Sequence, residues 1–166
     1  MAVIQKKICM LGSFAVGKTS LVRLFVESIY SETYQTTVGV KVDKKAVALD
    51  NTEVTLVLWD LYGEDDFQKM RWSNLRGASG YLLVGDGTRS ATLSKALDLE
   101  ERVRKEVGAL PFVFVINKCD LAQEWEIPAS FEAETAARKW TVLNSSAKTG
   151  KNVEEAFLQL TRKMLG

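Results

Sequence analysis

The sequence of 166 residues contains no histidine and only two cysteines, and these shortages exclude several kinds of protein. Without histidine, the chain has no Ser-His-Asp triad, no histidine-ligated metal and no histidine general base. Cys9 and Cys119 both lie in apolar, strand-like runs, which indicates thiols buried in a protein of a reducing compartment rather than a disulfide. We therefore expect a cytoplasmic protein.

An excess of one charge and long apolar stretches are also lacking. The net charge is +1 and the basic residues are scattered, so charge gives no reason to expect binding to nucleic acid or a membrane surface. The sequence shows no signal peptide and no apolar stretch long enough to span a bilayer. Only two prolines occur, without repeats or linker-like segments, so residues 1–166 are expected to form a single domain.

The strongest positive feature is a glycine-containing segment, GSFAVGKTS, at positions 12–20. It matches the phosphate-binding pattern G-x-x-x-x-G-K-[ST] and stands between a strand-like run and a helix-like segment, as that pattern requires. The glycines let successive N–H groups point at one anion, and the following helix N-terminus adds partial positive charge. A turn with a surface lysine is the simpler alternative, but it would not need this strand–loop–helix context.

Two side chains of this segment have specific expected roles. Lys18 is expected to reach the β- and γ-phosphates, and the hydroxyl of Thr19 is expected to ligate Mg²⁺. The predicted nucleotide-binding residues of the segment are Gly12, Ser13, Phe14, Ala15, Val16, Gly17, Lys18, Thr19 and Ser20.

Apolar runs and helix-period segments alternate along the chain, which predicts an α/β fold. Strands are expected at residues 4–11, 38–49, 54–59, 80–84, 112–116 and 140–143, and helices at 17–28, 93–107 and 153–164, with an irregular helix at 65–75. Asp50 and Asn51 predict a tight turn between two antiparallel strands. Asn152, with Glu155 three residues later, resembles a capping arrangement for the last helix. The predicted fold is a six-stranded, mostly parallel sheet with one antiparallel edge strand and helices on both faces.

Four further motifs follow the loop in order, the first just before a predicted strand and the other three after one. They are Thr37 in TTVG, Asp60 to Gly63, the run Asn117-Lys118-Cys119-Asp120, and Ser146-Ala147-Lys148. On these motifs the chain resembles the Ras superfamily of small GTPases over nearly its whole length. It is most similar to the Rab-like branch, through Thr37-Val38-Gly39, Trp59-Asp60, Arg76-Gly77-Ala78 and Asp86-Gly87-Thr88. The resemblance implies a P-loop GTPase fold that binds GTP and GDP with Mg²⁺.

One carboxylate explains a preference for guanine. Asp120 can accept hydrogen bonds from guanine N1–H and the exocyclic amine, a pattern that adenine does not present. The resemblance gives Asn117 the far edge of the base and a bracing role, and gives Lys118 a packing role over the ribose and base. It also assigns to the nucleotide site the residues Tyr30, Ser146, Ala147 and Lys148.

The resemblance further implies a switch that senses the γ-phosphate. Thr19, Thr37 and Asp60 are the implied metal ligands, with Asp60 acting indirectly, and the implied catalytic residues are Lys18, Thr37, Gly63 and Glu64. Loss of the γ-phosphate would release two segments, from Ser31 to Val40 and from Leu61 to Leu75. These segments are the implied contacts for an effector, an exchange factor and an activating protein.

Three positions depart from the family's pattern. Glu64 replaces the usual glutamine and cannot donate a hydrogen bond toward the transferring phosphoryl, a loss that typically costs about 10²–10³ in rate, although it could polarise the attacking water. Phe14 replaces a small residue and would crowd the approach of an arginine finger, unless its ring packs outward. Leu61-Tyr62 replaces a small pair, and the Rab-type aromatic set is incomplete, so effector choice does not transfer.

These observations favour a GTP-binding switch that hydrolyses GTP slowly when alone. A GTP-binding interaction module with negligible hydrolysis is the alternative, supported by Glu64 and Phe14, and Asp120 disfavours an ATP-dependent kinase. No C-terminal cysteine box follows the last predicted helix, so no lipid anchor is expected in this chain. A naturally tail-less protein and a shortened one both fit that observation.

Overall fold

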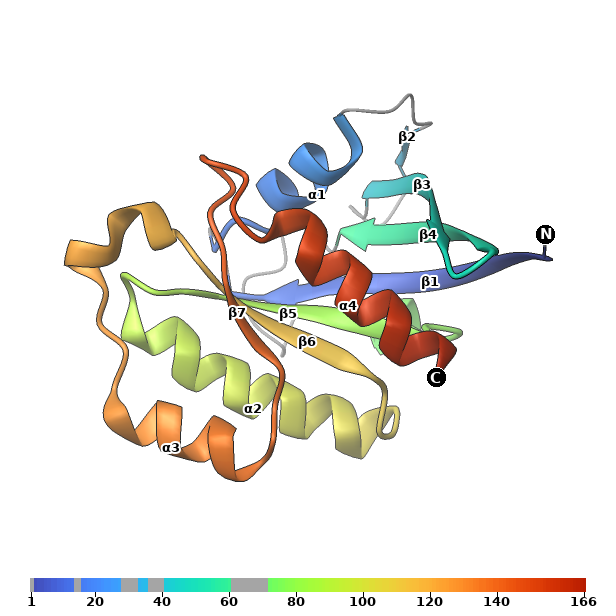
Figure 1. Cartoon of the computed structure of the whole chain (residues 1–166). Helices are drawn as coiled ribbons and strands as arrows, with labels where there is room; N and C mark the ends of the chain where they lie inside the picture. Colours follow the sequence, from blue (N-terminus) through green and yellow to red (C-terminus); the bar gives the residue numbers. More distant parts are fainter. Residues whose placement is uncertain (1, 14–15, 28–32, 36–40, 61–71) are drawn as a thin grey trace.

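The computed structural model describes residues 2–13, 16–27, 33–35, 41–60 and 72–166 (Figure 1). In these residues one sheet runs in the order β2-β3-β4-β1-β5-β6-β7. Its strands are β1 Ala2–Gly12, β2 Thr33–Gln35, β3 Lys41–Leu49, β4 Thr52–Asp60, β5 Gly80–Asp86, β6 Phe112–Asn117 and β7 Val142–Asn144. Strands β4, β1, β5, β6 and β7 are parallel, whereas β3 pairs antiparallel with β4 and β2 with β3. The predicted fold class is confirmed, and the three-residue β2 adds one strand to the six expected.

The described part of the chain has four α-helices, of which the first three connect strands and the last follows β7: α1 Lys18–Glu27, α2 Ser90–Glu106, α3 Ala129–Ala137 and α4 Val153–Leu165. Short 3₁₀ turns, η1 Trp72–Leu75 and η2 Cys119–Glu124, complete the set. Helix α3 was not predicted from the sequence; it is short and buries only Phe131 and Thr135. The expected helix at 65–75 is described only from residue 72, as η1.

The start of α4 differs from the capping arrangement predicted for Asn152. The backbone of Asn152 has φ +58°, in the left-handed region, and its side chain makes no capping hydrogen bond to α4. Instead, Asn152 Nδ2 donates to the carbonyl of Asn144 at 2.8 Å. The side chain therefore ties α4 to the end of β7, which explains why it cannot also cap the helix.

Each face of the sheet is covered by a pair of helices (Figure 1). Along β1, Ile8 and Met10 pack in the cluster that includes α1 and α4, whereas Cys9 and Leu11 pack in the cluster that includes α2 and α3. This alternation follows from the two-residue period of a strand, and it buries β1 on both sides. Phe25 stacks on Phe157 with 4.1 Å between ring centroids, which joins α1 to α4.

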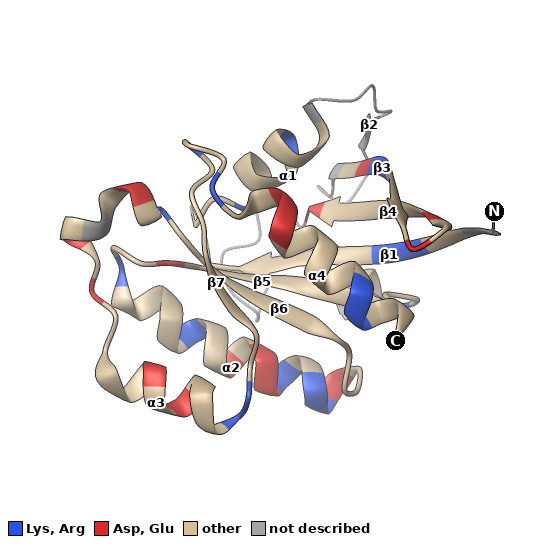
Figure 2. Ribbon diagram, viewed as in Figure 1, with Lys and Arg blue, Asp and Glu red and all other residues tan. Residues whose placement is uncertain are grey.

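Acidic and basic residues both occur along α2 and α4 (Figure 2). Helix α4 carries Glu154 and Glu155 in its first turn and Arg162 and Lys163 in its last, an order that complements the helix dipole. Among the described residues, no helix combines the length and the apolar character that crossing a bilayer requires.

The parallel strands determine where the candidate site lies. The carboxyl ends of β1, β4, β5, β6 and β7 lie at one edge of the sheet, because the strands run in the same direction. Their last residues are Gly12, Asp60, Asp86, Asn117 and Asn144. Ligands of open α/β sheets bind beyond this edge. The tight turn at the opposite edge, Asp50-Asn51, has φ values of +47° and +64°, as a two-residue hairpin turn requires.

Candidate functional site

The loop between β1 and α1 approaches its neighbours so closely that two of its positions accept only glycine. At Gly12, with φ +154°, a Cβ atom would lie 2.4 Å from the carbonyl oxygen of Val84 on β5. At Gly17, with φ +108°, a Cβ atom would lie 2.2 Å from Asn117 Nδ2 at the end of β6. The glycines of the phosphate-binding pattern are therefore required by packing against two other strand ends as well as by the turn itself.

Two polar contacts form where α1 begins. Lys18 is 8% exposed, and its ammonium donates to the carbonyl of Gly12 at 2.7 Å, so the side chain spans the loop. Thr19 Oγ1 donates to Asp60 Oδ2 at 2.5 Å, and Asp60 is fully buried at the end of β4. Two of the three predicted metal ligands thus lie together, although one comes from the start of α1 and the other from the end of β4.

The donor set at this point fits Mg²⁺. A hydroxyl and a carboxylate are hard oxygen ligands, and Mg²⁺ is usually bound by one or two protein groups together with substrate phosphates. Within the described ranges, no group of three or more His, Cys, Asp or Glu residues could hold a metal ion by itself. Thr19 and Asp60 therefore suit a metal ion that arrives with a phosphate ligand.

Asn117 joins three segments of the site. Its side chain is 2% exposed, and Nδ2 donates to the carbonyl of Val16 in the phosphate loop at 2.9 Å. Its Oδ1 accepts from the backbone N–H of Ala147 at 3.2 Å and from Ser145 Oγ at 3.3 Å. One carboxamide thereby connects the phosphate loop with the segment after β7.

The Asp120 carboxylate lies exposed at the edge of this cluster and is oriented by a buried serine. Ser146 Oγ donates to Asp120 Oδ1 at 2.7 Å, and the same hydroxyl accepts from the N–H of Thr149 at 3.1 Å. Asp120 lines a cavity of about 340 Å³. Its lining consists of Gly17, Ser20, Asn117, Lys118, Asp120, Leu121, Ala147 and Lys148. The structure thus brings predicted base-side residues and predicted phosphate-loop residues into one pocket.

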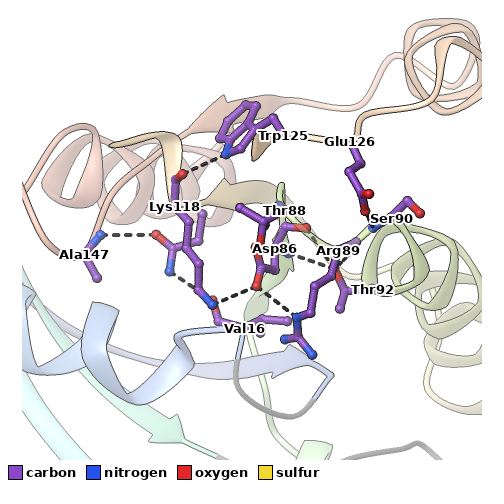
Figure 3. Close-up of polar contacts among 11 residues, drawn as sticks. Val16, Asp86, Thr88, Arg89, Ser90, Thr92, Lys118, Trp125, Glu126 and Ala147 are labelled. Carbon is purple, nitrogen blue, oxygen red and sulfur yellow. Dashed lines mark hydrogen bonds and ion pairs between the residues drawn. The ribbon is translucent and has the colours of Figure 1, made fainter. Parts of the chain in front are cut away.

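No site role was predicted for Asp86, Trp125 or Ser145, yet all three contact predicted site residues. Asp86 Oδ2 lies 2.8 Å from Lys118 Nζ, and Trp125 Nε1 donates to the Lys118 carbonyl at 2.7 Å (Figure 3). Asp86 could have been found, because it lies two residues after an apolar run whose carboxyl end belongs at the ligand edge of the sheet. Trp125 carries no such signal, since it lies in the irregular segment after η2.

Several predicted site residues lie outside the described residues. They are Phe14, Ala15, Tyr30, Thr37, Gly63 and Glu64. The same holds for most of the two predicted switch segments, of which residues 33–35 and 72–75 are described as β2 and η1. The roles of these residues stay predictions.

A mostly parallel sheet with helices on both faces, and with a glycine loop between its central strand and the first helix, defines the class of P-loop nucleotide-binding proteins. The sequence model of the Ras family matches residues 7–166. The chain is 33% identical over 164 residues to Ras-related protein Ral-a of Drosophila melanogaster, covering 95% of this chain and 80% of that protein. It is 31% identical over 163 residues to Ras-related protein Rab-19 of Homo sapiens, covering 96% and 75%. The chain therefore belongs to the Ras family of small GTPases, which confirms the predicted resemblance.

Proposed function

We propose that this small GTPase is a cytoplasmic switch that binds GTP and GDP with Mg²⁺ and, when alone, hydrolyses GTP slowly. The proposal treats residues 1–166 as one nucleotide-binding domain. The observation that carries it is the 340 Å³ cavity, where Asn117, Lys118 and Asp120 meet Gly17 of the phosphate loop. The two cysteines, neither of which forms a disulfide, agree with a reducing compartment.

In this proposal the base is selected by Asp120. Its carboxylate accepts hydrogen bonds from guanine N1–H and the exocyclic amine, and Ser146 keeps it oriented before the nucleotide arrives. The Ala147 N–H would exchange its hydrogen bond to Asn117 Oδ1 for one to the guanine oxygen, while Lys148 borders the cavity. Tyr30 would contact the plane of the base. Because the polar groups are held in advance, a base lacking the matching donors leaves them without partners and binds poorly.

At the phosphate end, Lys18 would exchange its hydrogen bond to Gly12 for contacts with the β- and γ-phosphates. Thr19, Thr37 and Asp60 would hold Mg²⁺, Asp60 indirectly, and the bound ion would neutralise charge on the phosphate oxygens. Gly63 would donate its N–H to the γ-phosphate.

The rate of hydrolysis is proposed to be low because of Glu64 and Phe14. Glu64 can accept a hydrogen bond from the attacking water but cannot donate one to the phosphoryl group. The second candidate is a GTP-binding interaction module with negligible hydrolysis, and the same two residues favour it. Single-turnover hydrolysis, with chromatographic identification of the co-purified nucleotide, separates the two. Release of phosphate from bound GTP supports the switch, and persistence of GTP supports the interaction module.

Partners are proposed to bind at residues 31–40 and 61–75 in a nucleotide-dependent manner. Amide hydrogen exchange in both segments should be slower with a non-hydrolysable GTP analogue than with GDP, because the γ-phosphate gives Thr37 and Gly63 a ligand. Thr37→Ala should remove most of the difference in residues 31–40. Equal protection in the two nucleotide states would contradict a switch.

A further inference from the structure

The Lys118 ammonium is held by a carboxylate that has no role in the function proposed above. Asp86 is the last residue of β5, its side chain is fully buried, and its Oδ2 lies 2.8 Å from Lys118 Nζ. Figure 3 shows the lysine side chain reaching from the turn after β6 to Asp86. Lys118 also lines the cavity assigned to the base, so this ion pair fixes one wall of that cavity.

Asp86 is itself held rigidly. The backbone N–H and the hydroxyl of Thr88 both donate to Oδ1, at 2.8 Å and 2.7 Å, while Arg89 Nε donates to Oδ2 at 3.0 Å. Burial alone would raise the pKa of the Asp86 carboxyl, but the hydrogen bonds from Lys118, Thr88 and Arg89 outweigh burial and lower the pKa to about 2. The carboxylate is therefore charged at neutral pH and cannot rotate away from the lysine.

The backbone of Lys118 needs a second anchor, because its φ of +71° is unfavourable for a residue with a side chain. Trp125 Nε1 donates to the Lys118 carbonyl at 2.7 Å, and the N–H of Leu121 donates to the same oxygen at 2.9 Å. The indole reaches this position only because residue 87 is glycine. A Cβ atom on Gly87 would lie 2.4 Å from Trp125 Cε2.

The two anchors belong to loops that are joined to each other. The N–H of Gly87 donates to the carbonyl of Asn117 at 3.1 Å, and the N–H of Glu126 donates to the carbonyl of Gly87 at 2.7 Å. The segment after β5 and the segment after β6 are therefore joined to each other, and Figure 3 shows Asp86 at the centre of the polar contacts between them.

We propose that Asp86 is a positioning residue of the base pocket: it holds Lys118 against the cavity and thereby slows the release of guanine nucleotide. Trp125 supports the same lysine from its carbonyl side. This inference rests on the proposed function, because it requires a guanine base in the cavity. A lysine that is ordered before binding does not lose side-chain freedom when the base packs against it, so the nucleotide is held more tightly.

The test is a double-mutant cycle on the release of a fluorescent GDP analogue from the Mg²⁺-loaded protein. Asp86→Asn and Lys118→Met should each accelerate release by about tenfold. The double variant should release no faster than Lys118→Met alone, because Asp86 acts through the lysine. In Asp86→Asn, the single-turnover rate of hydrolysis of bound GTP should equal the parent rate. A general loosening of the fold would change that rate as well. Multiplicative effects in the double variant would overturn the proposal.

Two further variants keep the test decisive. Glu100→Gln is the matched control, because Glu100 is another buried carboxylate, on α2, that pairs with Arg104 at 3.3 Å and does not line the cavity. This variant should release GDP at the parent rate. Trp125→Phe keeps a ring beside Gly87 but removes the donor to Lys118, and should accelerate release about threefold. It replaces Asp86→Asn if that variant does not fold, and an unchanged rate would then overturn the proposal. Failure of the parent protein to bind GDP would overturn the proposed function, whereas binding with unchanged release in Asp86→Asn overturns only the positioning role.

Discussion

The base end and the phosphate end of the candidate site differ in how closely they follow the pattern of the Ras superfamily. At the base end, Asn117, Lys118 and Asp120 keep the motif, and each makes a hydrogen bond or ion pair that orients it. At the phosphate end, Phe14 and Glu64 depart from the pattern. We therefore expect this chain to keep the recognition of a guanine nucleotide and to differ from its relatives in the rate of hydrolysis, with different residues controlling the two properties.

The largest expected effect concerns the base that the pocket recognises, which tests the role assigned to the base end. In the parent, GTP should bind more tightly than ATP by about 10⁴, because a site built for particular donors strongly rejects a base that lacks them. Asp120→Asn should shift the preference toward xanthine nucleotides, since the carboxamide offers a donor where the carboxylate offered only acceptors. Competition titration with the three triphosphates measures both effects. Asp98→Asn, on the exposed side of α2, is the matched control. Comparable affinity of the parent for ATP and GTP would reject the assignment of Asp120.

The second largest effect is expected at the phosphate end. With a matched activating protein, the pair Phe14→Gly and Glu64→Gln should raise the hydrolysis rate by about 10²–10³, because a donor is restored and the approach of an arginine finger is opened. The gain should exceed the product of the single effects, since both residues border one reaction centre. Single-turnover hydrolysis measures the rates, and GDP affinity should stay at the parent value. A parent that already turns over as fast as the pair would show that Phe14 points elsewhere.

The predictability of the two ends from sequence differs for a physical reason. Strands such as 80–84 and 112–116 were predictable because a continuous apolar run fits a strand that is buried on both faces. The phosphate loop was predictable because its chemistry requires glycines at fixed spacing. Helix α3 was missed, since its nine residues bury only Phe131 and Thr135 and leave little periodic signal.

The supports of the base pocket were harder to predict than its lining. The contacts of Asp86 with Lys118 and of Trp125 with the Lys118 carbonyl join residues whose proximity depends on the sheet order and on the path of a turn. The side chain of Asn152 was misassigned as a cap because local spacing suggested one partner, and the tertiary fold offered another at Asn144. Sequence spacing thus predicts the residues expected to contact the nucleotide more readily than it predicts the residues that position those contacts.

Substitution of Asn117 should weaken the base end and the phosphate end together, because its side chain connects them. Asn117→Ala removes the hydrogen bond to Val16 and both bonds accepted by Oδ1, from Ala147 and Ser145. We expect the affinities for GTP and GDP to fall equally, by about 10- to 100-fold, as the loss of buried hydrogen bonds implies. Ser145→Ala removes only the longest of these bonds and should have a much smaller effect. Titration of both nucleotides measures the affinities, and a loss confined to GTP would contradict the bridging role.

The smallest expected effect is the contribution of the Asp86 charge to the free energy of unfolding, which shows whether electrostatics as well as packing stabilises the base end. Burial opposes ionisation of Asp86, but its hydrogen bonds, that of Lys118 first, outweigh burial and lower the folded-state pKa from 3.8 to about 2. A lowered pKa contributes stability above the unfolded-state value, and that stability is lost as the pH falls toward the folded-state value. The free energy of unfolding should therefore drop by about 1 kcal/mol between about pH 5 and about pH 3 through this group. Denaturant unfolding at the two pH values measures this drop in the free energy of unfolding. The drop should be about 1 kcal/mol smaller in Asp86→Asn. It should equal the parent's drop in Trp125→Phe, because that variant keeps the Asp86 carboxylate. Equal drops in the parent and Asp86→Asn would mean that the base end is held by packing and neutral hydrogen bonds, and that the charge of Asp86 adds no stability.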